Sequence, residues 1–97
     1  MNSKQRAYLK GLAMNINPSF QIGKGMITPG YTEAIRENIE VNELIKISVL
    51  NNCDEDPKVL AQILADRTGS EVVQVIGKKI VLYKKAKKSK IDIDGVK

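Results

Sequence analysis

The sequence predicts a single α/β domain, with elements in the order α-β-α-β-α-β-β and a four-stranded, mostly parallel sheet whose last strand is antiparallel. Three observations predict this fold class. Three segments carry apolar residues at helical spacing, short β-branched runs alternate with them, and two final apolar runs are separated by a Gly-Lys pair. The length of 97 residues, 42% of them hydrophobic, suits one modest core. The helices are expected to cover one face of the sheet or to sandwich it.

The first half of the chain is predicted to form a helix, a strand and a second helix. Ser3 can cap the first helix, and Pro18 lies beyond its end. The apolar stripe of this helix consists of Tyr8, Leu9, Leu12, Ala13 and Ile16. Residues 19–23 form a short alternating strand. Thr28 then offers an N-cap with Pro29 at the first helical position, which predicts the start of the second helix.

A buried strand and a third helix are predicted next. Residues 44–50 (LIKISVL) are rich in β-branched side chains with few polar ones, as is typical of a strand covered on both faces. Asp56 and Pro57 repeat the pattern of an N-cap followed by proline and start the third helix. Gly69 suits the position after the last turn of that helix.

The last structured segment is predicted to be an antiparallel hairpin. Residues 72–76 and 79–84 are two β runs, and Gly77-Lys78 between them suits a type II′ turn. The lysine-rich remainder has little to pack. We therefore expect a folded domain over residues 1–85 and a flexible tail over residues 86–97.

The charge of the chain is divided by segment. There are 16 Lys and Arg residues against 11 Asp and Glu residues, for a net charge of +5. Residues 1–27 carry four bases and no acid, residues 28–71 four bases and nine acids, and residues 72–97 eight bases and two acids. If the fold brings the two basic ends together, they form a cationic face that attracts polyanions. The alternative is that these bases are solvated surface without a partner.

Composition excludes several kinds of site. The chain has no His, no Trp and one Cys, so it lacks an internal disulfide, the usual Cys/His zinc patterns and histidine-based catalysis. Cys53 has no His to activate it, and the acids at 54–56 complement the dipole of the following helix more simply than they bind a cation. We expect no enzyme activity, no cofactor and no metal. No apolar run approaches the roughly 20 residues of a membrane span, which together with the lack of a signal-peptide core predicts a cytoplasmic protein with no membrane partner.

A glycine-rich loop leads into the second helix. Residues 23–30 (GKGMITPG) end at a helix N-terminus, where unpaired N–H groups and the helix dipole favour an anion. Glycine lets the backbone approach a phosphate closely, and Lys24 supplies a cation in the same turn. The alternative is that Gly23 and Gly25 merely permit a tight turn from strand to helix. The loop is not a P-loop, because no GK[ST] follows at the required spacing.

Four stretches of the sequence resemble one known family. They are KQRAYLKGLA at 4–13, FQIGKG at 20–25, ELIKISVL at 43–50 and VVQVIGKKIVLYK at 72–84. On these residues the sequence resembles the CRM (chloroplast RNA splicing and ribosome maturation) domain in its small stand-alone bacterial form, the YhbY-type RNA-binding proteins. The resemblance covers residues 3–85. It implies RNA binding, a role in assembly of the large ribosomal subunit, and a fold similar to the C-terminal domain of bacterial translation initiation factor three.

Two positions depart from the family pattern. The family loop GxxG falls on residues 23–26, so that Met26 stands where the family has its second glycine. Either Gly25 takes over the close backbone approach by a shift of one residue, or the contact at Met26 is looser. The family also tends to have a His just after the first helix, where this chain has Met14, so no role of that His carries over.

The residues predicted to contact RNA are the glycine loop and the bases of the two ends. They are Gly23, Lys24, Gly25, Met26, Arg6, Lys10, Lys4, Lys78, Lys79, Lys84 and Lys85. Arg6 and Lys10 share one face of the first helix and are expected to reach phosphates beside the glycine loop. The alternative for each base is an exposed position without a ligand. The three tyrosines (Tyr8, Tyr31 and Tyr83) are candidates for base stacking, but their spacing favours core packing.

Two functional hypotheses follow. In the first, the chain is a monomeric RNA-binding protein that acts on large-subunit ribosomal RNA or its precursor, with ribosomal proteins as further candidate partners. In the second, it is a protein-interaction adaptor that docks through its acidic middle helices and does not contact RNA directly.

Overall fold

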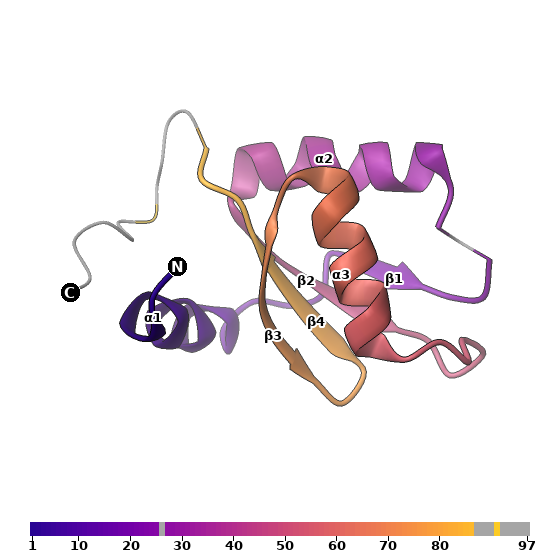
Figure 1. The fold of residues 1–97 in the computed structure, drawn as a ribbon, viewed down its shortest axis with the longest axis horizontal. Coiled ribbons are helices and arrows are strands. Elements are labelled where there is room, and N and C mark those ends of the chain that lie inside the picture. Colours follow the sequence, from indigo (N-terminus) through magenta and orange to yellow (C-terminus); the bar gives the residue numbers. More distant parts are fainter. Residues whose placement is uncertain (26, 87–90, 92–97) are drawn as a thin grey trace.

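The computed structural model describes residues 1–25, 27–86 and 91 of the chain (Figure 1). The predicted order of helices and strands is confirmed over these residues. The elements are α1 (Ser3–Ala13), β1 (Phe20–Ile22), α2 (Pro29–Asn42), β2 (Leu44–Val49), α3 (Pro57–Thr68), β3 (Glu71–Ile76) and β4 (Lys79–Tyr83). Of the predicted tail, residues 87–90 and 92–97 lie outside the described residues, and Ile91 packs against the core on the α1 side of the sheet.

The sheet has four strands in the order β1-β2-β4-β3. The prediction of an α/β domain with an antiparallel last strand is confirmed. β1 pairs with β2 in parallel, and β4 runs antiparallel to both β2 and β3. β1, β2 and β3 therefore share one direction, but β4 lies between β2 and β3, so β1 and β2 form the one parallel pair. The two-residue turn between β3 and β4 forces these strands to be neighbours, and β4 then fills the place beside β2.

Helices cover both faces of the sheet, but not to the same extent. Alternate residues of β2 point to opposite sides. Ile45, Ile47 and Val49 belong to the larger core under α2 and α3, whereas Leu44 belongs to a smaller cluster with Leu9 of α1. In Figure 1, α1 lies on one side of the strands and α2 and α3 on the other. The fold is therefore a three-layer sandwich with one short, single-helix layer.

The α1 side of the sheet is partly open, which corrects the prediction that the strand at 44–50 is covered on both faces. Leu44 is buried under α1, but Lys46 and Ser48 on the same side of β2 are only half-buried. The 11-residue α1 covers one end of the sheet and stops before the other. We call the uncovered part the open face. Its side chains are Gln21, Lys46, Ser48, Gln74, Ile76 and Lys79.

Side-chain caps begin all three described helices. The N-cap of α1 is Asn2 and not the predicted Ser3, because the Asn2 side chain accepts from the N–H of Gln5 at 2.8 Å and Gln5 Oε1 accepts from the N–H of Asn2 at 3.0 Å. The predicted caps Thr28 and Asp56 are confirmed. No helix in the described part of the chain is long and apolar enough to span a membrane.

Left-handed backbone marks two of the predicted turns. Gly69 ends α3 with a φ of 67°, and its N–H donates to the carbonyl of Ala65. Gly77 has a φ of 55° at the first central position of the hairpin turn, as a type II′ turn requires. A β-bulge between Val72 and Gln74 bends β3 where α1 packs on it.

Candidate nucleic-acid interface

The predicted glycine loop follows β1 at the carboxyl end of the strand. Gly23 is buried, whereas Lys24 and Gly25 are exposed. Gly25 has a φ of 73°, and apart from its two chain neighbours no residue has a heavy atom within 4 Å of the place where a Cβ would stand. The loop therefore offers open space for a close backbone approach at Gly25. Met26 lies outside the described residues.

An acidic loop stands beside Lys24. A hollow of about 520 Å³ is lined by Lys24, Gly25, Val59, Cys53 and the three acids of residues 54–56. The carboxylates make the electrostatic potential on this side of the loop more negative, so they repel an approaching phosphate. A polyanion can therefore reach Lys24 favourably only from the side away from the acids. Cys53 itself is buried, and no group of three or more acids, cysteines or histidines able to hold a metal ion occurs among the described residues.

The hairpin turn lies at the same end of the sheet as the glycine loop. Lys79 pairs with Ser48 in the register of β2 and β4, and the N–H of Val49 donates to the carbonyl of Lys78 at 2.7 Å. Lys79 Nζ donates to Ser48 Oγ at 2.7 Å, and Lys78 Nζ donates to Asn51 Oδ1 at 2.9 Å. The structure thus brings Lys78 and Lys79 to the end of the sheet where β1 and β2 also finish.

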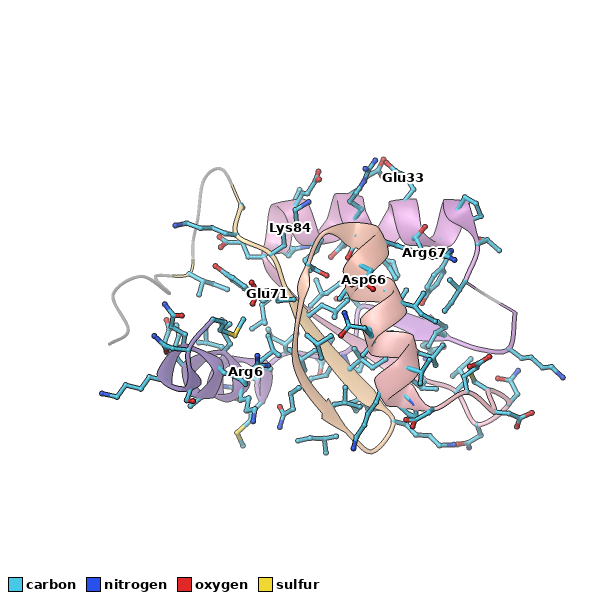
Figure 2. The ribbon with its side chains drawn as sticks, viewed as in Figure 1. Arg6, Glu33, Asp66, Arg67, Glu71 and Lys84 are labelled. Atoms are coloured by element: carbon cyan, nitrogen blue, oxygen red, sulfur yellow. The ribbon has the colours of Figure 1, made fainter. Side chains whose placement is uncertain are left out.

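Arg6 and Lys10 lie at the other edge of the sheet, which corrects the prediction that they flank the glycine loop. α1 packs across β2, β4 and β3, and Arg6 on it bonds to β3. β1 and β3 are the two edge strands, so about 14 Å of sheet separates them at the usual strand spacing. Figure 2 shows Arg6 reaching from α1 toward β3.

Arg6 holds α1 on the sheet. Its Nη1 donates to the carbonyls of Val72 and Val73 at 2.6 and 3.1 Å, on the bulge of β3. Lys10, one turn further along α1, is exposed. Together with Lys58 of α3 these two bases line an open cleft of about 470 Å³ along the β3 edge. Lys4 is exposed in the first turn of α1.

The lysines at the end of β4 lie far from the glycine loop. Tyr83 pairs with Leu44 at the start of β2, so Lys84 and Lys85 follow at the opposite end of the sheet. Lys84 Nζ donates to Glu40 Oε1 at 3.1 Å and to the carbonyl of Thr68 at 3.3 Å, in the last turn of α3 (Figure 2). Lys84 thus closes the carboxyl end of a helix, a position that favours a cation.

The three tyrosines have different environments. Tyr83 is buried, as predicted. Tyr31 donates its hydroxyl to the carbonyl of Gln21 at 2.6 Å and packs edge-on against Phe20, and its partial burial raises the pKa of its hydroxyl above the ordinary value. Tyr8 is 38% exposed on α1, so the prediction that it packs in the core is wrong.

Sequence reasoning missed the open face. There, a hollow of about 150 Å³ lies between the end of α1 and the sheet. Its main lining residues are Met14, Lys46, Gln74, Ile76, Lys79 and Val81. The signal was present in LIKISVL, where Lys46 and Ser48 alternate with apolar residues and so share one side of the strand. Neither lysine of the hollow forms an ion pair with a described residue.

Known proteins resemble this chain over nearly its whole length. A family model described as the CRS1/YhbY (CRM) domain matches residues 1–84. The Bacillus subtilis protein named "Probable RNA-binding protein YqeI" is 42% identical over 93% of this chain and 94% of its own length. A Haemophilus influenzae protein named "RNA-binding protein" is 31% identical over 96% of this chain and 94% of its own length.

A solved structure agrees with the fold. The solution structure of a hypothetical protein from Staphylococcus aureus superposes with a TM-score of 0.79, at 48% identity, over 93% of this chain and 94% of that one. The resemblance noted from the sequence is thus confirmed by a family match over residues 1–84 and by relatives of almost equal length. The chain belongs to the CRS1/YhbY (CRM) domain family.

Proposed function

We propose that the protein binds RNA and carries out no chemistry on it. The observation that carries this proposal is a continuous cationic area that runs from the β3 edge, between α1 and α3, onto the open face. The β3-edge cleft and the hollow on the open face share Gln74 and Ile76, and no side chain lining either of them is acidic among the described residues. We call this area the basic surface. Its bases are Arg6, Lys10, Lys46, Lys58 and Lys79.

The acids of the chain support the same choice of face. α1 contains no acid, whereas Glu33, Glu37 and Glu40 are exposed on α2 and the residues at 54–56 are exposed before α3. A polyanion is therefore repelled from the exposed side of α2 and from the loop before α3, and it meets no acid on α1. The names of the two relatives, which state RNA binding for those proteins, agree with this polarity.

The bound RNA would run from the β3 edge across the open face toward the glycine loop. Lys10 and Lys58 contact phosphates at one edge, Lys46 and Lys79 at the centre, and Lys24 at the far end. Arg6 keeps α1 in place and adds its charge to the edge. Neutralising each phosphate releases condensed counterions, so the affinity falls steeply with added salt.

The proposed target is large-subunit ribosomal RNA or its precursor. The family resemblance supports this choice, and the small number of aromatic residues supports recognition of RNA shape rather than of a base sequence. The chain would stabilise a folded RNA segment during assembly of the subunit. Sedimentation of cell extracts tests this role: the protein should travel with free or precursor large subunits and be absent from translating ribosomes.

Direct binding tests the RNA proposal. Fluorescence anisotropy would follow binding to transcripts of large-subunit ribosomal RNA over a series of salt concentrations. The variant Lys10→Glu/Lys79→Glu should lose about 100-fold in affinity at low salt, since each reversal removes a phosphate contact and adds a repulsion. The control is Arg36→Glu/Arg67→Glu, which changes the net charge equally on exposed positions of α2 and α3.

Two results would contradict the proposal. If both double variants weaken binding equally, net charge and not the basic surface determines the affinity. If the wild-type protein binds no transcript at low salt, RNA binding itself is wrong, and the adaptor hypothesis that uses the acidic helices becomes the better one.

A further inference from the structure

The hollow on the open face has a defined shape. α1 ends at Ala13, and Met14 projects beyond it with 82% of its surface exposed. The lining also includes the buried side chain of Val81, which we take as the floor, and Ile76, a second large apolar side chain that is 60% exposed at the end of β3. Such large apolar side chains, left exposed around a concavity, mark a place where another molecule can bury them.

Three polar side chains of the hollow, Lys46, Lys79 and Gln74, have positions fixed by the strand pairing. In the register of the sheet, Ile76 is opposite Lys79, and Gln74 and Lys46 both lie opposite Val81. Lys46 and Lys79 therefore come from the two central strands on the same side of the sheet. Gln74, on the edge strand β3, is half-buried, and its amide can both donate and accept a hydrogen bond.

Size and charge limit what can occupy the hollow. Its volume of about 150 Å³ is below the range of about 300–1,000 Å³ typical of sites for drug-sized ligands, so the occupant is a small group. The two ammonium groups have no acidic partner among the described residues, so the occupant or its neighbours carry negative charge. A flat apolar ring joined to phosphates meets both conditions.

We propose that this hollow receives one unpaired base of the bound RNA, with the phosphates on either side of that base on Lys46 and Lys79. The inference rests on the proposed function and adds to it a preference for RNA with an unpaired nucleotide. Met14 and Ile76 contact the faces of the base, and the Gln74 amide meets its edge. Methionine suits this position because its flexible thioether makes favourable contacts with rings. A base inside a duplex cannot enter, because its faces are covered by its neighbours in the stack.

The variant Met14→Ala/Ile76→Ala tests the pocket without changing any charge. The probes are a fluorescein-labelled oligouridylate of about ten nucleotides and an RNA duplex of the same length. The double variant should bind the oligouridylate about threefold to tenfold more weakly than the wild type does, since contacts to one base face are lost. Its affinity for the duplex should not change. Val41→Ala removes from α2 an aliphatic side chain whose exposure is similar to that of Ile76, and it is the matched control.

A crosslink provides a measurement that does not depend on a variant. An oligonucleotide with one 4-thiouridine, irradiated in complex with the wild-type protein, should attach to the peptides that contain Met14 or Ile76. Crosslinks confined to other peptides would overturn the inference.

The remaining outcomes separate this inference from the proposed function. If the double variant binds both probes as the wild type does, no base enters the hollow, while RNA binding stands. If the double variant loses affinity equally for the oligouridylate and the duplex, the loss is not specific to an unpaired base. The inference then fails, while RNA binding stands. If the wild-type protein binds neither probe, the inference and the proposed function both fail.

Discussion

The two faces of the central strands differ in what their side chains do. On the α2 and α3 side, Ile45, Ile47 and Val49 of β2 are at most 4% exposed and belong to the larger core. On the α1 side of the same strand, Lys46 and Ser48 remain half-buried and reach solvent. One strand therefore contributes stability through one set of residues and a candidate binding surface through the other. This division can be tested residue by residue.

The largest expected effect is on stability. Ile47 is fully buried in the larger core, so Ile47→Ala should lower the free energy of unfolding by about 3 kcal/mol. Urea denaturation followed by circular dichroism measures this value. At temperatures where the variant remains folded, its affinity for RNA should equal that of the wild type. A loss of RNA affinity in the folded variant would mean that the two faces are not independent.

Arg6 should have the second largest effect, again on stability. Arg6→Ala removes two hydrogen bonds from a charged donor to β3, and we expect unfolding to become easier by about 2 kcal/mol. Lys10→Ala, one turn away and exposed, should change stability by less than about 0.5 kcal/mol. The same urea series compares the two variants. Equal effects would show that Arg6 does not anchor α1.

The open face should respond in affinity and not in stability. Lys46→Gln/Lys79→Gln removes two charges, and we expect the Kd for single-stranded RNA to rise about tenfold at low salt. The slope of log K against log salt should become shallower by about 1.4, since two phosphate contacts are lost. The thermal midpoint should stay close to that of the wild type. An unchanged salt slope would exclude both lysines from the interface.

The smallest expected effect is at the glycine loop. Gly25→Ala places a Cβ on a residue with a φ of 73°, which should cost about 1 kcal/mol although the space around it is open. Gly30→Ala, in the first turn of α2, is the matched control and should be neutral or stabilise by about 0.5 kcal/mol. The thermal midpoints of both variants measure these changes in stability. Equal midpoints would mean that the left-handed turn is not required.

The helices were predicted well from short sequence patterns, because the interactions that start and end a helix involve residues that are close together in the chain. Thr28 with Pro29 and Asp56 with Pro57 begin helices where the sequence predicts them, and Gly69 ends one. Asn2 was missed as the cap of α1 because Ser3 is also a good capping residue, and only the reciprocal bonds with Gln5 distinguish the two.

The arrangement of the site was harder to predict because it depends on the order of strands. In the strand order of this sheet, β4 lies between β2 and β3, and this order separates Arg6 from the glycine loop. Charge alone could not reveal this, since Lys84 and Lys79 look equivalent in sequence, yet one caps α3 and the other lies on the open face. The alternation of Lys46 and Ser48 did carry a local signal, but a strand of high apolar content obscured it.

The position of Arg6 over β3 has a consequence for how copies of the chain meet. β3 is an edge strand, and the unpaired backbone groups of an edge can pair with the edge of another sheet. Arg6 occupies the carbonyls of Val72 and Val73 in the first half of β3, and Lys10 and Lys58 place like charges along this edge. Two copies that approach through β3 therefore repel each other before their strands can pair. The cations that would hold RNA would thus also oppose the extension of this sheet into a second molecule.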